Sequence, residues 1–168
     1  MSKKLPPAIS EDEFVKLIEN TQKDEHKIAF LLGFGSGLRI SEVINLKPSD
    51  INLQEKKIFI RQGKGGKDRI VPVPKGFKEK HLTLFPLKIG MRAIQKAFKN
   101  NARKARLLDS KPSLHFHSLR HGFGSQMAKK GIPIHHIRTL MGHSNISTTN
   151  VYLELNPNEA IKAYEDKF

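Results

Sequence analysis

The amino-acid sequence predicts an α+β fold that is mainly α-helical, with one small antiparallel β-sheet. Apolar residues recur at helical spacing through most of the chain, whereas residues 57–73 read as two strands around a glycine-rich turn. No internal repeat, low-complexity stretch or interdomain linker interrupts the pattern. We therefore expect a single domain over residues 1–168.

The N-terminal third predicts three helices. Ser10, with Glu13 three positions later, forms a capping-box pattern that starts the first helix. A second helix begins near Asp24 and ends at the Gly-Ser-Gly of residues 35–37. A short helix over residues 41–46 follows, and a Lys-Pro step closes it.

The rest of the chain predicts a hairpin and further helices. Residues 57–61 and 69–73 are the two strands, and residues 62–68 make their turn. A long basic helix is predicted over residues 90–107. The remaining predicted helices cover residues 117–130, 133–141, 145–153 and the stretch after Pro157.

Positive charge is concentrated in the middle of the chain. The formal net charge is +14, and residues 56–111 hold 17 Lys+Arg against 3 Asp+Glu, whereas residues 1–55 hold 7 against 9. A local basic field attracts polyanions and speeds their capture. We therefore expect nucleic acid as the partner rather than a merely solubilising surface. An anionic membrane is a weaker alternative, because no clearly amphipathic helix with large apolar anchors accompanies the charge.

The composition excludes several classes of protein. The chain has no cysteine, which rules out disulfides, thiolate zinc sites and cysteine nucleophiles. No apolar run approaches the roughly 20 residues of a membrane span, and the first residues lack the apolar core of a signal peptide. We expect a soluble, cytoplasmic protein with no membrane partner.

Five side chains form a set suited to chemistry on a phosphodiester: Arg39, His117, Arg120, His143 and Tyr152. The planar donor fork of arginine matches phosphate oxygens. Histidine moves protons near neutral pH, and tyrosine can attack phosphorus. Each residue taken alone is better interpreted as a surface, capping or core residue, so the argument depends on the combination.

The spacing of these residues adds to the argument. His117 and Arg120 are three apart, so on a helix they share a face and could reach one phosphate. His121 is expected to point elsewhere on that helix, with a structural role or a phosphate contact. Tyr152 follows His143 by nine positions.

Two lysines and a group of histidines complete the candidates. Lys64 and Lys67 lie in the glycine-rich turn, where a lysine can reach a DNA groove or protonate a leaving alkoxide, although a solvent-exposed tip is the common alternative. His135, His136 and His143 do not match a metal-binding motif, and no carboxylate or cysteine completes a ligand shell. We predict no metal and no cofactor.

In this order and spacing, the set resembles the catalytic domain of the tyrosine recombinases, also called the phage integrase family. The resemblance extends from about residue 8 to the end of the chain. The segments that carry it are residues 37–42, 63–67, 117–121, 141–144 and 147–149, together with Tyr152.

The resemblance implies the tyrosine recombinase catalytic-domain fold and a role for each residue. Arg39 and Arg120 would hold the non-bridging oxygens of the scissile phosphate and stabilise the transition state. His117 would assist proton movement at the nucleophile. Glu42 would orient an arginine or lysine from behind the site.

The resemblance assigns the covalent chemistry to the remaining residues. Tyr152 would attack phosphorus, giving a 3′-phosphotyrosyl link and a free 5′-hydroxyl. Lys64 would protonate the departing 5′-oxygen, because the family places its lysine first in such a turn. His143 would hydrogen-bond the phosphate. The implied reaction requires neither metal nor ATP.

The implied partner is double-stranded DNA. A tetramer on DNA and a monomer in solution are expected.

Most relatives carry an N-terminal core-binding domain that closes a clamp around DNA. We expect this domain to be absent here, which leaves open that a separate core-binding partner supplies it. Residues 154–168 predict a C-terminal tail helix that docks either on a neighbouring protomer or on its own domain. The candidate DNA contacts are Lys67, Arg69, Arg92, Lys96 and Arg103.

The function that the sequence predicts is that of a site-specific DNA recombinase or integrase. The alternatives are a non-catalytic DNA-binding regulator of the same fold and a fragment that needs a separate clamp domain. A type IB topoisomerase-like activity would use the same chemistry without partner exchange. A metal-dependent nuclease is least favoured, because the acidic ligands it needs are not clustered.

Overall fold

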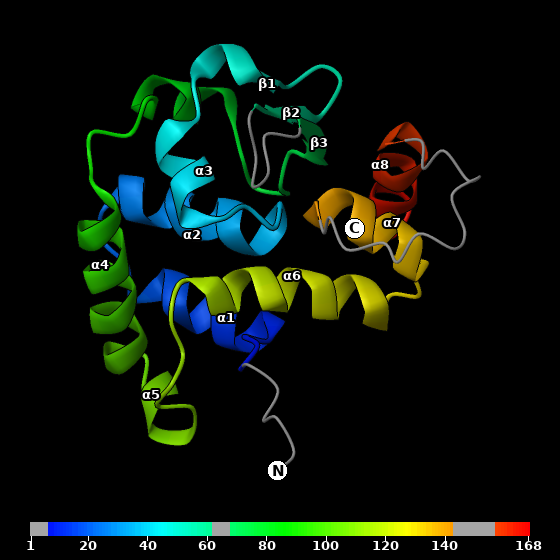
Figure 1. The fold of residues 1–168 in the computed structure, drawn as a ribbon. Coiled ribbons are helices and arrows are strands. Elements are labelled where there is room, and N and C mark those ends of the chain that lie inside the picture. Colours follow the sequence, from blue (N-terminus) through cyan, green and yellow to red (C-terminus); the bar gives the residue numbers. More distant parts are fainter. Residues whose placement is uncertain (1–6, 62–67, 143–156) are drawn as a thin grey trace.

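The computed structural model describes residues 7–61, 68–142 and 157–168 and confirms a mainly helical fold with one small antiparallel sheet (Figure 1). In chain order the elements are α1 (Glu11–Glu19), α2 (Asp24–Gly35), α3 (Ile40–Asn45), η1 (Pro48–Asp50), β1 (Ile51–Asn52), β2 (Lys57–Ile60), β3 (Arg69–Pro72), η2 (Glu79–Leu84), α4 (Met91–Lys104), α5 (Leu107–Ser110), α6 (His117–Lys129), α7 (Ile134–Met141) and α8 (Pro157–Glu165).

The predicted helices are found within a few residues of their expected bounds. The capping box of α1 is present: the Ser10 N–H donates to the Glu13 carboxylate at 2.8 Å, and the Glu13 N–H donates to the Ser10 hydroxyl at 3.2 Å. The long basic helix is shorter than predicted, because Arg106 adopts a left-handed conformation (φ 59°) and the short helix α5 starts after it. The helix predicted over residues 145–153 lies outside the described residues.

The sheet contains three antiparallel strands in the order β1-β2-β3, one more than predicted. Strand β1 escaped prediction because two residues are too few to show alternation. In the β2–β3 pair, Lys57 is opposite Pro72 and Ile60 is opposite Arg69. Arg69 therefore lies at the end of the ladder next to the turn.

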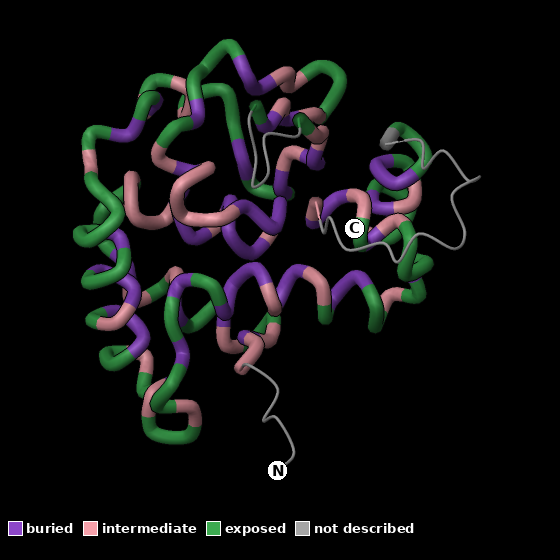
Figure 2. Tube along the Cα trace, viewed as in Figure 1, coloured by how far each residue is buried: buried purple, intermediate pink, exposed green. Residues whose placement is uncertain are grey.

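Helices α2 and α6 run side by side through the centre of the molecule, and α4 crosses beyond their ends (Figure 1). Glycine permits the close approach of α2 to α6: a Cβ at Gly33 would lie 3.1 Å from the Leu119 side chain. Figure 2 shows buried positions along the facing sides of both helices. Because interiors are close-packed, this contact fixes α6 relative to the end of α2.

A second apolar cluster joins the C-terminal half of α6 to α7 and α8. On α8, Ala160, Ile161 and Tyr164 are buried, and the Tyr164 hydroxyl donates to the Gly35 carbonyl at 3.1 Å. Helix α8 thus packs on its own domain in this structure, and its docking on a neighbouring protomer stays a prediction. In the described parts of the chain, no helix combines the length and apolarity that a membrane crossing requires.

Candidate functional site

Arg39 is held at the start of α3 by the side chain of Glu42. The chain leaves α2 through Gly37, whose φ of 67° favours glycine, and Arg39 then occupies the N-cap position. Its N–H donates to Glu42 Oε2 at 2.8 Å, and its Nη1 donates to Oε1 at 3.1 Å. The bond to Glu42 orients the Arg39 guanidinium, and because the side chain is 21% exposed, the guanidinium is still accessible.

Arg120 comes from the first half of α6 and is almost completely buried. Its Nη1 donates to the Gly37 carbonyl and its Nη2 to the Met141 carbonyl. This one side chain therefore joins the turn after α2 to the end of α7. Burial, followed by the positive charges of Arg39 and Arg69, lowers the pKa of Arg120 to about 9, so the guanidinium stays protonated at pH 7.

Glu42 lies between two arginines. Arg69 donates from Nη1 to Oε1 at 2.7 Å and from Nη2 to Oε2 at 2.8 Å, the same two oxygens that accept from Arg39. Burial alone would raise the pKa of Glu42, but the hydrogen bonds and charges of Arg69 and Arg39 outweigh it and lower the pKa to about 2. Glu42 is thus a fixed carboxylate, and because Arg120 is also within electrostatic range of it, the cluster of these four side chains carries a net positive charge.

His117 is the first residue of α6, within the electrostatic reach of Arg39 and Arg120. Desolvation of its ring, followed by the charges of His121 and Arg120, lowers its pKa to about 4. At neutral pH the imidazole can therefore accept a proton. The expectation that His121 points elsewhere was wrong: its ring lies edge-on to that of His117 with centroids 4.7 Å apart, because residues four apart share a helix face.

Several predicted site residues lie outside the described residues: Lys64, Lys67, His143 and Tyr152. The chain has two tyrosines, and the other one, Tyr164, is described. Burial raises the pKa of Tyr164 to about 12, and its hydroxyl is bonded to a backbone carbonyl. Tyr164 is therefore part of the core and unsuited to act as a nucleophile.

Four of the candidate DNA contacts lie in the described part of the chain, and they fall into two groups. Arg92, Lys96 and Arg103 are all exposed along α4, spaced so that they share one face of the helix. Arg69 is different, because its side chain is only 9% exposed and bonded to Glu42 and to the Leu140 carbonyl. This geometry gives no support to the prediction that Arg69 contacts DNA. The prediction was made from the sequence position of Arg69, which does not show that the side chain is buried.

An open groove of about 940 Å³ lies beside Arg39, between α3 and strand β2. Its wall includes Lys47 and Arg61, and Arg61 donates to the buried carboxylate of Asp50 at 2.9 Å. Among the described residues, no group of three or more His, Asp or Glu side chains is placed to hold a metal ion. The arrangement offers the accessible guanidinium of Arg39 for an anion, the positive charge of the buried Arg120 near it, and an imidazole that can accept a proton.

The sequence profile of the phage integrase family matches residues 7–159, which include every described residue of this site. The chain belongs to the phage integrase family. Tyrosine recombinase XerA of Pyrococcus horikoshii is 33% identical over 176 aligned residues, covering 97% of this chain and 62% of that protein. A tyrosine recombinase of Thermosipho africanus is 30% identical and shows similar coverage, 96% and 62%. The resemblance inferred from the motifs is confirmed.

Solved structures of phage integrase family members show the same fold. A crystal structure of XerA recombinase has a TM-score of 0.69 at 28% identity and covers 98% of this chain and 66% of its own. The XerH recombinase bound to its difH substrate has a TM-score of 0.70 at 22% identity, covering 97% and 55%. These likenesses confirm the predicted catalytic-domain fold. The chain spans about three fifths of the length of the curated relatives it matches.

Proposed function

We propose that this chain is the catalytic domain of a site-specific recombinase that cleaves and rejoins double-stranded DNA in the cytoplasm. The observation that carries the proposal is the placement of Arg39 and Arg120 about one cationic site, with the imidazole of His117 beside them. Membership of a family that contains tyrosine recombinases supports the reaction type.

The proposed step is a transesterification at phosphorus. The Tyr152 oxygen attacks the scissile phosphate, the bond from phosphorus to the 5′-oxygen breaks, and a 3′-phosphotyrosyl ester forms. His117, which is uncharged at neutral pH, accepts the phenolic proton, and Lys64 supplies a proton to the leaving 5′-oxygen. Arg39 and Arg120, with His143, stabilise the charge on the non-bridging oxygens.

The reverse step rejoins the strands. A 5′-hydroxyl attacks the phosphotyrosyl ester and releases Tyr152, so the bond energy is retained without ATP. Exchange between two duplexes needs several active sites, and we propose a tetramer on DNA. The exposed cations on α4, Arg92, Lys96 and Arg103, together with Lys67, are proposed to hold the DNA backbone.

Covalent trapping tests this function. The protein is incubated, without added metal, with supercoiled plasmid and nicked fragments from the replicon that encodes it, then denatured and assayed for protein-linked DNA. We expect the adduct with the wild type and its loss in Tyr152→Phe, whose DNA binding should be unchanged. Tyr164→Phe is the matched control, because it removes the other tyrosine hydroxyl, which is buried, and should still form the adduct.

Two outcomes would contradict the proposal. An adduct that persists in Tyr152→Phe would show that Tyr152 is not the nucleophile. DNA binding with a steep salt dependence but no adduct in the wild type would favour a DNA-binding regulator of the same fold.

A further inference from the structure

Arg69 makes hydrogen bonds to two separate parts of the site. Its Nη1 and Nη2 donate to the two carboxylate oxygens of Glu42, on α3, at 2.7 and 2.8 Å. Its Nε donates to the Leu140 carbonyl at the end of α7 at 3.1 Å. All three guanidinium nitrogens are thus used within the protein, and only 9% of the side chain is exposed.

Each of these contacts leads through one further hydrogen-bonded group to a predicted catalytic arginine. Glu42 accepts from both the backbone and the guanidinium of Arg39. The carbonyl next to that of Leu140 belongs to Met141 and accepts from Arg120. Arg69 therefore supports Arg39 through Glu42, and it supports Arg120 through the last turn of α7.

Arg69 also packs against the residue that leads into the His143 segment. A Cβ on Gly142 would lie 2.8 Å from Arg69 Cδ, and Gly142 has a φ of 62°. The side chain of Arg69 thus fills the space that the missing side chain of Gly142 leaves. In the sequence, Arg69 is the first residue of β3 and directly follows the predicted turn.

We infer that Arg69 is a positioning residue: it fixes the start of β3 to Glu42 and to the end of α7, and so sets the positions of Arg39 and Arg120. This inference rests on the proposed function, in which those arginines hold the scissile phosphate. It requires the planar fork of arginine, because its three separate nitrogens point to Glu42 and to Leu140, whereas the three donors of a lysine all lie on one nitrogen.

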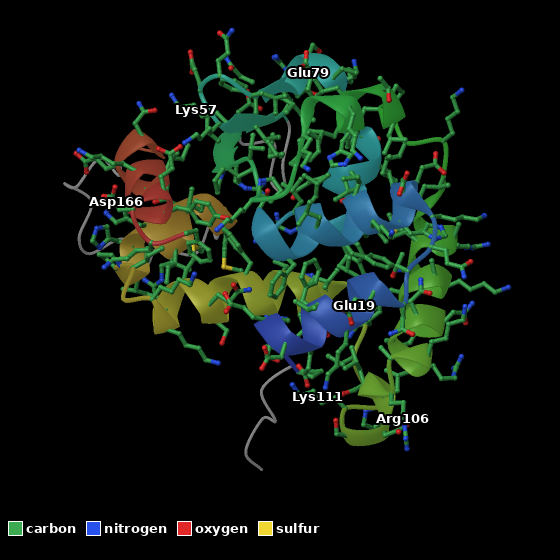
Figure 3. All side chains as sticks on the ribbon, turned by 180° about the vertical axis from the view of Figure 1, so that it is seen from behind. Glu19, Lys57, Glu79, Arg106, Lys111 and Asp166 are labelled. Carbon is green, nitrogen blue, oxygen red and sulfur yellow. The ribbon has the colours of Figure 1, made fainter. Side chains whose placement is uncertain are left out.

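The test separates a positioning role from a DNA contact. Arg69→Lys keeps the positive charge and loses the fork, and Arg69→Gln loses both. Lys57→Gln is the matched control: it removes a cation from the same strand pair, where Lys57 pairs with Glu55 at 3.2 Å, three residues along the ladder from the Arg69 position. Figure 3 shows Lys57 on the sheet, on the opposite side of the molecule from Arg106.

Two quantities are measured on a nicked duplex that carries the cleavage site mapped by trapping. They are the single-turnover rate of adduct formation at saturating DNA and the dissociation constant at two salt concentrations. We expect both Arg69 variants to react on the order of 10- to 100-fold more slowly, as for the loss of a residue that orients an active-site group. The dissociation constants should stay within about threefold, and Lys57→Gln should match the wild type.

A different pattern would overturn the inference. If Arg69→Lys reacts at the wild-type rate, or if the Arg69 variants lose only affinity together with part of the salt dependence, Arg69 contacts DNA instead. Thermal unfolding of each variant shows whether it is folded. If Arg69→Gln fails to fold, the Arg69→Lys comparison still decides.

Amide hydrogen exchange of the free protein provides a readout that does not need catalysis. The Arg39 N–H is bonded to Glu42, so its exchange should be at least about tenfold faster in Arg69→Lys and unchanged in Lys57→Gln. Unchanged exchange at Arg39 would refute the coupling. If the wild type formed no adduct while exchange at Arg39 responded to Arg69→Lys, the proposed function would fail and the coupling would stand.

Discussion

Replacing Glu42 by Gln should destabilise the domain by about 3 kcal/mol at pH 7. Glu42 has a folded-state pKa of about 2 against an ordinary value of 4.5. Because a tenfold change in proton affinity corresponds to about 1.4 kcal/mol, this difference amounts to about 3 kcal/mol of stabilisation of the charged form. The same size, about 3–5 kcal/mol, is typical when one partner of a buried ion pair is removed.

The destabilisation should also depend on pH in a defined direction. A carboxylate whose pKa is lowered by folding stabilises the protein fully above its unfolded-state value, here 4.5, and loses that contribution as the pH falls toward about 2. The difference between the wild type and Glu42→Gln should therefore be constant from pH 7 to about pH 5. By about pH 3 it should have fallen to about half.

Urea unfolding of both proteins at several pH values measures this difference. Glu55→Gln is the control, because the Glu55–Lys57 ion pair is at the surface and should contribute no more than about 0.5 kcal/mol. A loss below about 1 kcal/mol at pH 7, or a loss that does not change between pH 7 and pH 3, would refute the assignment of Glu42 as a carboxylate fixed between two arginines.

Two further predictions concern the neighbouring groups. In an NMR titration of the free protein, the His117 imidazole should titrate near pH 4; a midpoint at or above the ordinary 6.5 would contradict the described environment. Neutral His117 contributes to stability above pH 6.5, and that contribution should be lost as the pH falls from 6.5 toward 4. Gly142→Ala should cost about 1–3 kcal/mol in urea unfolding, because alanine is strained at a φ of 62° and its Cβ meets Arg69; wild-type stability would show that the turn relaxes.

The sequence was most informative where the signal is local. The capping box of Ser10 and Glu13 and the hairpin ladder follow from patterns only a few residues long, and both are present. Arg39 and Glu42 are likewise three positions apart, and the structure shows them bonded. Spacing of this kind can be read because helix and turn geometry fix which neighbours meet.

What the sequence could not show depends on long-range contacts. Glu42 meets Arg69 across 27 positions, and Arg120 meets the Gly37 carbonyl across 83. Packing of α2 against α6 accompanies the second of these contacts, and both form only in the folded protein, so no local pattern marked Arg69 as buried. The predicted roles of Lys64, His143 and Tyr152 remain predictions, since these residues lie outside the described part of the chain.

The identity of the residue and of the DNA end in a trapped adduct tests the central claim most directly. The adduct is digested with nuclease and protease, the modified peptide is sequenced by mass spectrometry, and the freed DNA end is tested for phosphorylation by a polynucleotide kinase. The account predicts a nucleotide linked through its 3′-phosphate to Tyr152, and a 5′-hydroxyl that the kinase labels directly. A link at any other residue, or a 5′-phosphate on the freed end, would contradict it.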